Sequence, residues 1–181
     1  MHQGMKAILI DEITLQKRIK KLGEQITKDY RGKNPLIICI LKGAVLFMAD
    51  LVQKIDTFIE MDFMATSSYG ASIKSSGEVR ILKDLDKSVE GRDVLIVEDI
   101  VDSGLTLSYI MRLLKDRRAH SIKVCTLLEK PARRIAEVEM DYVGFKVPNE
   151  FVVGYGLDYD EKYRNLPYIG VLKEEIYNEQ L

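Results

Sequence analysis

The chain has 181 residues, of which 46% are hydrophobic, and a formal net charge of −1 at pH 7. This length suits one domain large enough to bury a core, and the dispersed, balanced charge gives no basic surface that would favour nucleic acid or an anionic membrane. Neither a leader pattern nor an apolar run of membrane-spanning length is visible, so we expect a cytoplasmic protein that acts on a small substrate.

The first half of the chain predicts a helix, a buried strand and a second helix. Residues 12–30 carry apolar side chains at helical spacing, with Lys and Arg on the other face. The wholly apolar run Leu36–Leu41 is typical of a parallel strand, and residues 44–55 are expected to be helical. Lys42 and Gly43 therefore follow the carboxyl end of a strand, where open α/β sheets bind ligands.

A polar segment interrupts the next two predicted strands. Residues 58–66 alternate between apolar and polar side chains, and strand character resumes at residues 78–82. The intervening residues are mostly Ser and Gly, too small to pack a core. Loops of this length in compact domains are usually lids or disordered segments, so we expect a long loop inside a hairpin.

The segment Val94–Leu107, VLIVEDIVDSGLTL, contains the densest group of function-capable residues. Val94–Val97 predict a buried strand, and a helix is expected after Gly104. The acid pair Glu98 and Asp99 is expected at the strand end, and the following loop contains Asp102, Ser103, Gly104 and Thr106.

This loop is suited to binding a phosphate group. The backbone N–H groups of residues 102–106, including Leu105, together with the hydroxyls of Ser103 and Thr106, lie where a helix N-terminus attracts anions. Gly104 allows a ligand to approach the backbone closely. The two acids would then face a diol or a metal ion. The alternative is that Ser103 only caps the helix and the acids form a solvated strand end.

The second half predicts one further buried strand and a group of short ones. Residues 122–128 form an apolar run that ends at Glu129–Pro131, which places Lys130 at the same sheet edge as the acid pair. Short strands at 142–147 and 151–153 are expected to form a small hood with the N-terminal region. A last strand at 168–172 and an exposed helix follow.

The Val94–Leu107 motif resembles the phosphoribosyl-diphosphate (PRPP) motif of type I phosphoribosyltransferases, most closely that of the hypoxanthine-guanine enzymes. Four further stretches resemble this family in the same order, namely LKG at 41–43, SSYG at 67–70, LLEK at 127–130 and FVVGYGLDYDEKYR at 151–164. The resemblance implies an α/β fold of the type I phosphoribosyltransferase class, with a parallel-sheet core flanked by helices. We expect one domain, 1–181, with the core at about 34–146 and the hood at about 1–12 and 147–181.

The resemblance also implies roles at the PRPP side of the site. The loop of Lys42 and Gly43 would meet pyrophosphate through its backbone, with a cis peptide between Leu41 and Lys42, and Arg164 would contact pyrophosphate directly. Ser68 and Tyr69 would belong to a lid that closes over the reaction centre and excludes water.

The remaining implied roles concern the purine and the metal. Lys130 would donate to the exocyclic oxygen of a 6-oxopurine, Phe151 would stack on the base and Val152 would contact it through backbone groups. Asp158, on the purine side, would also bind Mg²⁺ beside pyrophosphate. Glu98 and Asp99 would hold the ribose hydroxyls and the metal with its waters, and Asp102 is the candidate general base for purine N7.

These roles predict a purine-salvage enzyme that makes IMP or GMP and pyrophosphate from PRPP and hypoxanthine or guanine, with Mg²⁺ as cofactor and a homodimer or homotetramer as the assembly. Xanthine remains open, whereas Lys130 and FVVGYGLDY disfavour adenine and orotate. The alternative is a regulatory RNA-binding protein with the same fold and uracil phosphoribosyltransferase activity. Structural alternatives also stand for single residues: Lys42 and Lys130 as surface lysines, and Phe151 as a core aromatic.

Overall fold

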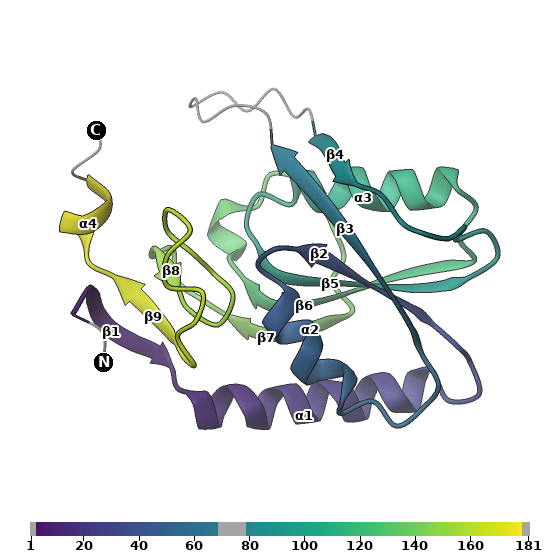
Figure 1. Ribbon diagram of the computed structural model, residues 1–181, viewed down its shortest axis with the longest axis horizontal. Coiled ribbons are helices and arrows are strands. Elements are labelled where there is room, and N and C mark those ends of the chain that lie inside the picture. The colour runs from purple at the N-terminus through teal and green to yellow at the C-terminus, as the bar shows by residue number, and fades with distance from the viewer. Residues whose placement is uncertain (1–2, 69–78, 179–181) are drawn as a thin grey trace.

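The central sheet is mixed and lies between two helical layers (Figure 1). We describe a computed structural model of the chain over residues 3–68 and 79–178. Within these ranges six strands pair in the order β4-β3-β2-β5-β6-β7, and only the β3–β4 pairing is antiparallel. The strands are β2 (Leu36–Leu41), β3 (Glu60–Ser68), β4 (Val79–Lys83), β5 (Asp93–Val101), β6 (Ser121–Glu129) and β7 (Tyr142–Lys146).

The helices cover opposite faces of this sheet because side chains of β5 alternate between them. Leu95 and Val97 belong to the core formed with α1 (Glu12–Asp29) and α2 (Val45–Val52). Val94 and Ile96 pack instead with α3 (Leu105–Asp116). The predicted helices, the hairpin and the three apolar strands are all confirmed, as is the expected parallel-sheet core flanked by helices, to which β4 adds one antiparallel strand.

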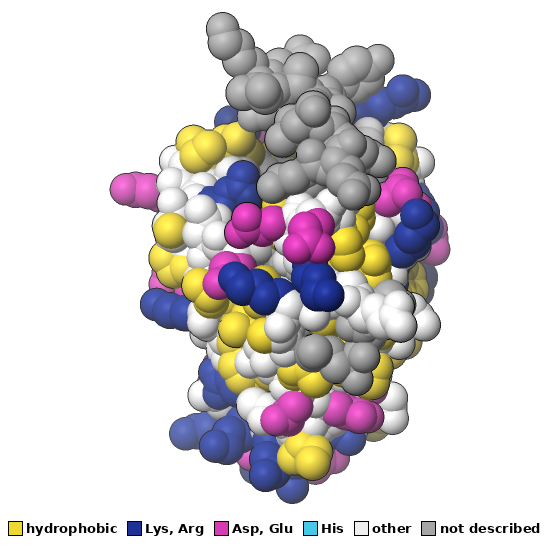
Figure 2. Space-filling model, turned by 90° about the vertical axis from the view of Figure 1, so that its left-hand side faces the viewer, with side chains coloured by type: hydrophobic (Ala, Val, Ile, Leu, Met, Phe, Trp, Pro, Cys, Tyr) yellow, Lys and Arg dark blue, Asp and Glu magenta, His cyan; other side chains and the backbone are white. Residues whose placement is uncertain are grey.

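A separate three-stranded antiparallel sheet lies beyond one end of the central sheet (Figure 1). It contains β1 (Met5–Ile10), β9 (Ile169–Leu172) and β8 (Val152–Val153), and α4 (Glu174–Asn178) follows it. The N- and C-terminal segments thus meet in this small sheet, which we call the hood. Viewed from this end, acidic and basic side chains lie next to one another and neither sign dominates the visible face (Figure 2).

The strand expected at 142–147 is not part of the hood, so that prediction is wrong. β7 pairs parallel to β6, with Cys125 opposite Tyr142. The connection, residues 130–141, contains only the 3₁₀ turn Pro131–Arg133. A parallel crossover needs about a dozen residues, and it usually contains a helix. Here the connection meets the length requirement without one.

The strand before the phosphate loop is longer than predicted. β5 continues to Val101, so Glu98 and Asp99 lie inside the strand and not in the loop after it. The continuation is explained by pairing with β6, which places Glu98 opposite Thr126 and Ile100 opposite Leu128. Ladder pairing therefore outweighs the polar character of the two acids.

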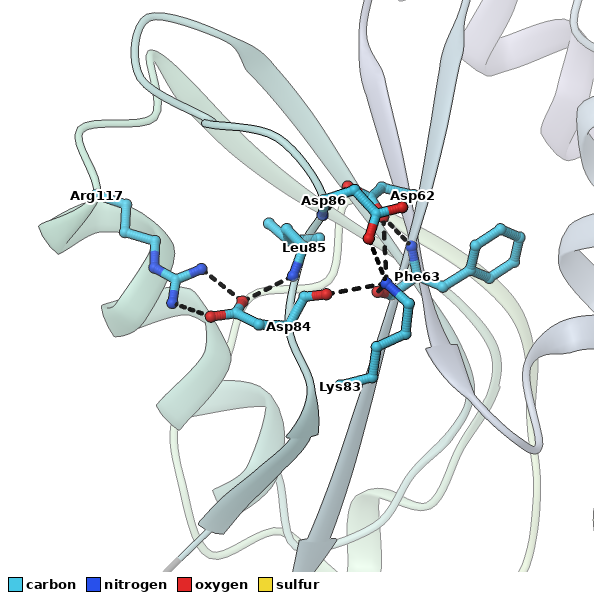
Figure 3. A network of polar contacts seen from close by, with 7 residues as sticks. All are labelled: Asp62, Phe63, Lys83, Asp84, Leu85, Asp86 and Arg117. Atoms are coloured by element: carbon cyan, nitrogen blue, oxygen red, sulfur yellow. Dashed lines mark hydrogen bonds and ion pairs between the residues drawn. The ribbon is translucent and has the colours of Figure 1, made fainter.

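A polar network fixes the base of the β3–β4 hairpin against α3 (Figure 3). The Lys83 ammonium donates to the Phe63 carbonyl at 3.1 Å and lies 3.7 Å from the buried Asp62 carboxylate. Asp84, which follows β4, accepts two hydrogen bonds from Arg117 at the end of α3, at 2.7 and 2.6 Å. The network holds the end of the hairpin at which β4 finishes, at Lys83.

Two further features of the chain are its cysteines and the lengths of its helices. Cys39 and Cys125 are both buried free thiols, as predicted, and burial raises the pKa of Cys39 to about 12. Across residues 3–68 and 79–178, the helices are too short or too polar to cross a lipid bilayer.

Candidate functional site

The loop between β5 and α3 encloses a cavity of about 120 Å³ at the helix N-terminus. Gly104 is the N-cap of α3 and has a left-handed backbone (φ +79°), and the Ser103 hydroxyl accepts a long bond from the Leu105 N–H at 3.4 Å. The cavity is lined by Glu98, Ile100, Val101, Asp102, Ser103, Gly104, Thr106 and Leu107. The predicted phosphate-binding groups therefore surround one space, although Ser103 also contributes to capping.

Glu98 is a buried carboxyl group at the side of this cavity. It is 8% exposed, and burial, with a smaller contribution from Asp99, raises its pKa well above the ordinary value of 4.5. An uncharged carboxyl group can donate as well as accept a hydrogen bond. Glu98 is thus suited to a neutral hydroxyl, such as one of a sugar diol.

A second cavity, of about 260 Å³, adjoins the first and shares Ile100 and Asp102 with it. Four segments far apart in the sequence contribute to it: the end of β5, the turn after β6, the start of β8 and the loop beyond. It is lined by Asp99, Ile100, Asp102, Lys130, Arg133, Phe151, Val152, Leu157 and Asp158. All the residues that the sequence assigned to the purine lie here.

Lys130 and Asp102 form the polar centre of this second cavity. Lys130 is 5% exposed, and its ammonium lies 3.9 Å from Asp102 Oδ1. Burial lowers the pKa of Lys130, while Asp102 partly opposes that shift and Arg133 adds to it. Asp102 Oδ1 is buried without a hydrogen-bond partner among the described residues. A buried, unpartnered acceptor beside a buried donor is suited to a small ligand that supplies both a donor and an acceptor.

Phe151 forms an aromatic wall of the same cavity. Its side chain is 38% exposed, stacks on Tyr177 of α4 with ring centroids 5.0 Å apart, and meets the edge of Tyr159 at 5.6 Å. This exposure argues against a core role. The contact with Tyr177 holds the ring, which lines a cavity large enough for a planar base.

Asp99 and Asp158 are the groups here that fit a magnesium ion. Burial raises the pKa of Asp99 to about 6; hydrogen bonds from backbone N–H groups oppose this shift, and Asp158 adds to it. The described residues contain no group of three or more His, Cys, Asp or Glu that could enclose a metal. Two carboxylates beside open space match the preference of Mg²⁺, which keeps waters and takes further oxygens from a phosphate substrate. Glu98 lines the other cavity.

The Lys42–Gly43 turn lies directly against Asp99. The peptide between Leu41 and Lys42 is cis, as the sequence comparison implied. A side chain at Gly43 would overlap the Asp99 carboxylate, so only glycine allows this approach. The Lys42 ammonium is exposed and pairs with Glu161 at 3.0 Å.

Arg164 connects this turn with Asp158. Its guanidinium lies 2.9 Å from Asp158 and 3.3 Å from Glu161, and donates to the Gly156 carbonyl at 2.7 Å. Glu161 therefore joins Arg164 to the side chain of Lys42, whose loop was predicted to meet pyrophosphate through its backbone. Two cations beside the carboxylates of Asp99 and Asp158 are suited to binding a polyanion.

The predicted lid residues are described only in part. Ser68 ends β3, where its backbone pairs with Val79. Tyr69 lies outside the described residues.

Two charged residues of the site were not predicted. Arg133 lies in the second cavity, 3.6 Å from Asp102, and Glu161 lies between Lys42 and Arg164. Arg133 stands three residues after Lys130, a spacing that brings side chains together on a turn. Glu161 stands three residues before Arg164, which is the same spacing, whereas its other partner, Lys42, is 119 residues away.

Comparison with known proteins gives consistent matches over nearly the whole chain. The phosphoribosyl transferase domain family matches residues 6–160. The chain is 62% identical to the bifunctional protein TilS/HprT of Listeria monocytogenes over 99% of its own length, but spans only 28% of that protein. It is 59% identical to a hypoxanthine-guanine phosphoribosyltransferase of Streptococcus thermophilus, covering 98% of this chain and 99% of the relative. A crystal structure of a hypoxanthine phosphoribosyltransferase from Staphylococcus aureus matches with a TM-score of 0.95 and 54% identity, covering 98% of this chain and 96% of the other.

Proposed function

The chain belongs to the phosphoribosyl transferase family, and on this premise we propose that it transfers the 5-phosphoribosyl group of PRPP to N9 of hypoxanthine or guanine, which gives IMP or GMP and pyrophosphate. One observation carries the proposal: Lys130, Asp102 and Phe151 line a single base-sized cavity that adjoins the cavity at the N-terminus of α3. The names of close, full-length relatives support it.

The base is recognised and activated by three side chains. Lys130 donates to the exocyclic oxygen of a 6-oxopurine, an acceptor that adenine lacks. Phe151 stacks on the ring. Asp102, whose Oδ1 has no partner, takes the proton from N7 as N9 attacks C1 of the ribose. The bond between C1 and the pyrophosphate oxygen breaks, and its electron pair leaves with pyrophosphate.

The groups around the leaving pyrophosphate stabilise its negative charge. Arg164 and Lys42 supply positive charge at its expected position, and the backbone around residues 102–106 holds the 5-phosphate. Glu98 and Asp99 bind the ribose hydroxyls. Bound Mg²⁺, held by Asp99 and Asp158, would supply charge neutralisation on the leaving group.

The test is Mg²⁺-dependent release of pyrophosphate from PRPP with hypoxanthine, guanine, xanthine, adenine, uracil and orotate offered separately. Turnover with hypoxanthine and guanine, and none with adenine, uracil or orotate, is the expected result. Turnover with uracil alone would overturn the proposal in favour of the regulatory alternative, which the names of the relatives do not favour.

We also propose that the enzyme acts in the cytoplasm as a homodimer or homotetramer. Large apolar side chains that are exposed near the β3–β4 edge support association, namely Phe58, Met61 and Leu82. Light scattering of the purified chain tests the assembly, and a monomer at assay concentration would contradict it.

A further inference from the structure

Tyr155 has an unusual backbone in the loop that leads to Asp158 and Arg164. Gly154, Tyr155 and Gly156 have φ angles of +100°, +49° and +99°, so three consecutive residues are left-handed. A tyrosine rarely adopts this conformation, which is held when surrounding contacts fix it. Tyr155 is only 6% exposed, so the contacts that hold its backbone in this conformation are made inside the protein.

The Tyr155 hydroxyl is fixed by two other elements. It donates a hydrogen bond to the Asp50 carboxylate on α2, and the Gln16 amide of α1 donates to the same carboxylate at 2.6 Å. Burial, together with the hydrogen bond to Asp50, raises the pKa of Tyr155, so the phenol keeps its proton. The mechanism proposed above uses none of these three residues.

The backbone of Tyr155 is connected to the pyrophosphate side of the site. Its N–H donates to the Leu166 carbonyl at 2.8 Å, and the next N–H, of Gly156, donates to the Arg164 carbonyl at 2.9 Å. The Arg164 guanidinium donates back to the Gly156 carbonyl and contacts Asp158. Gly156 also lies directly against the Gly43 carbonyl.

The loop thus contacts the Lys42–Gly43 turn through Gly156 and contacts the helix that follows this turn through Tyr155. α2, which carries Asp50, begins directly after the Lys42–Gly43 turn, at Val45. We propose that Tyr155 is a positioning residue. Its hydrogen bond to Asp50, which we call the tether, fixes the loop of Asp158 and Arg164 against the Lys42–Gly43 turn and so sets the position of the pyrophosphate subsite. The inference rests on the proposed function, because it assigns the tether to the site where pyrophosphate leaves.

The decisive variant is Tyr155→Phe, which removes the hydroxyl and keeps the ring in the core. We expect the Kd for Mg²⁺·pyrophosphate, measured by calorimetry, to rise about tenfold, as for other groups that orient ligand-holding side chains. The KM for PRPP rises in parallel, whereas the KM for hypoxanthine changes less than about twofold. A residue that served only stability would leave these constants unchanged below the melting temperature.

A matched control is present in the same chain. Tyr142 is 5% exposed, and its hydroxyl donates to the Asp29 carboxylate at 2.6 Å. It opens β7, at the end of the parallel strands opposite to the site. Tyr142→Phe therefore loses a similar buried hydrogen bond, and we expect its Kd for Mg²⁺·pyrophosphate to stay within about twofold of the wild type.

Two variants of Asp50 test the tether from its other end. The Asp50→Asn carbonyl oxygen can still accept from Tyr155 and Gln16, so its Kd for Mg²⁺·pyrophosphate should stay within about threefold. Asp50→Ala removes the acceptor and should match Tyr155→Phe.

The outcomes separate the tether from the proposed function. If Tyr155→Phe and Tyr142→Phe have the same Kd for Mg²⁺·pyrophosphate, or if the hypoxanthine KM rises as much as the PRPP KM, the tether is overturned. Nucleotide formation by the wild-type chain is measured independently and decides the proposed function. A wild-type chain that binds no Mg²⁺·pyrophosphate overturns the tether, whatever reaction it catalyses.

Discussion

The two neighbouring cavities of the site are constructed differently. The cavity at the N-terminus of α3 is formed by one continuous segment, from Glu98 to Leu107. The larger cavity takes its lining from segments that are separated by up to about a third of the chain, from Asp99 to Asp158. They meet at Ile100 and Asp102, which line both.

This difference indicates how each cavity can be altered. A cavity made by one strand, one loop and one helix is held by local backbone geometry and by pairing of β5 with β6. The other depends on the hood, on the turn after β6 and on the loop of Asp158 keeping their relative positions. We therefore expect substitutions in the second cavity to change purine use while binding of the 5-phosphate is retained.

The largest effect is expected at Asp102, where the cavities meet. Asp102→Asn removes the proton acceptor and preserves the shape, so kcat should fall about 100- to 10,000-fold. The Kd for PRPP, measured by calorimetry, should stay within about threefold because the backbone groups of the loop remain. An unchanged kcat would exclude Asp102 as general base, and a lost PRPP affinity would mean that the cavities do not act separately.

A smaller effect is expected at Lys130, which belongs to the second cavity alone. Lys130→Met keeps the apolar stem and removes the donor, which should lower kcat/KM for hypoxanthine on the order of 100-fold. Binding of PRPP should be retained. Lys146→Met is the control, because this lysine is 73% exposed on β7 and should leave kcat/KM unchanged. If the Lys130 variant lost PRPP affinity by the same factor as kcat/KM for hypoxanthine, the two cavities would not act separately.

The acid pair predicts how stability of the ligand-free protein changes with pH. Burial raises the pKa of Asp99 from 3.8 to about 6 in the folded state, so the folded chain keeps a proton that the unfolded chain has lost. The contribution of this group to the free energy of unfolding is full below its unfolded pKa, and it is lost as pH rises through about 6. Glu98, raised in the same direction, adds to the loss at higher pH.

Urea unfolding of the wild type and of Asp99→Asn measures this effect. Between about pH 5 and pH 8, the wild type should lose about 1 kcal/mol relative to the variant. Carboxylates remote from Asp99 cancel in this difference because both chains contain them, whereas Glu98, whose pKa Asp99 raises, adds to the difference in the same direction. A difference that does not change with pH would show that Asp99 is ionised in the folded state across this range.

Much of the fold and one cavity could be predicted because their determinants are local. Apolar runs predicted β2, β5 and β6, and the Val94–Leu107 motif predicted the loop whose residues line the first cavity, since strand, loop and helix follow one another directly. Lys130 and Phe151 were predicted as purine contacts from resemblance to a family; they occupy the ends of separate elements, and only the fold brings them together.

The parts that failed depend on partners distant in sequence. The placement of β7 and the length of β5 are both decided by pairing with β6, which the residues of either strand do not specify alone. Tyr155 and Asp50 are 105 residues apart, and tyrosine in a Gly-Tyr-Gly run gives no indication of a left-handed backbone held by a helix. Such contacts follow from packing, and periodicity contains no information about them.

The smallest effect is expected at Glu161, which connects the two cations near the second cavity. Its carboxylate pairs with both Lys42 and Arg164, and it therefore competes with pyrophosphate for them. The Lys42 and Glu161 side chains are 69% and 65% exposed, so water and salt screen the pair and the competition is weak. Glu161→Gln should lower the Kd for Mg²⁺·pyrophosphate about twofold at low salt and less at high salt. Asp160→Asn is the matched control in the same loop, because the Asp160–Lys162 pair is similarly exposed and includes neither Lys42 nor Arg164. A weaker affinity in the Glu161 variant would mean that this acid orders the loop more than it occupies the cations, and the second cavity would then depend on ion pairs as well as on the tether.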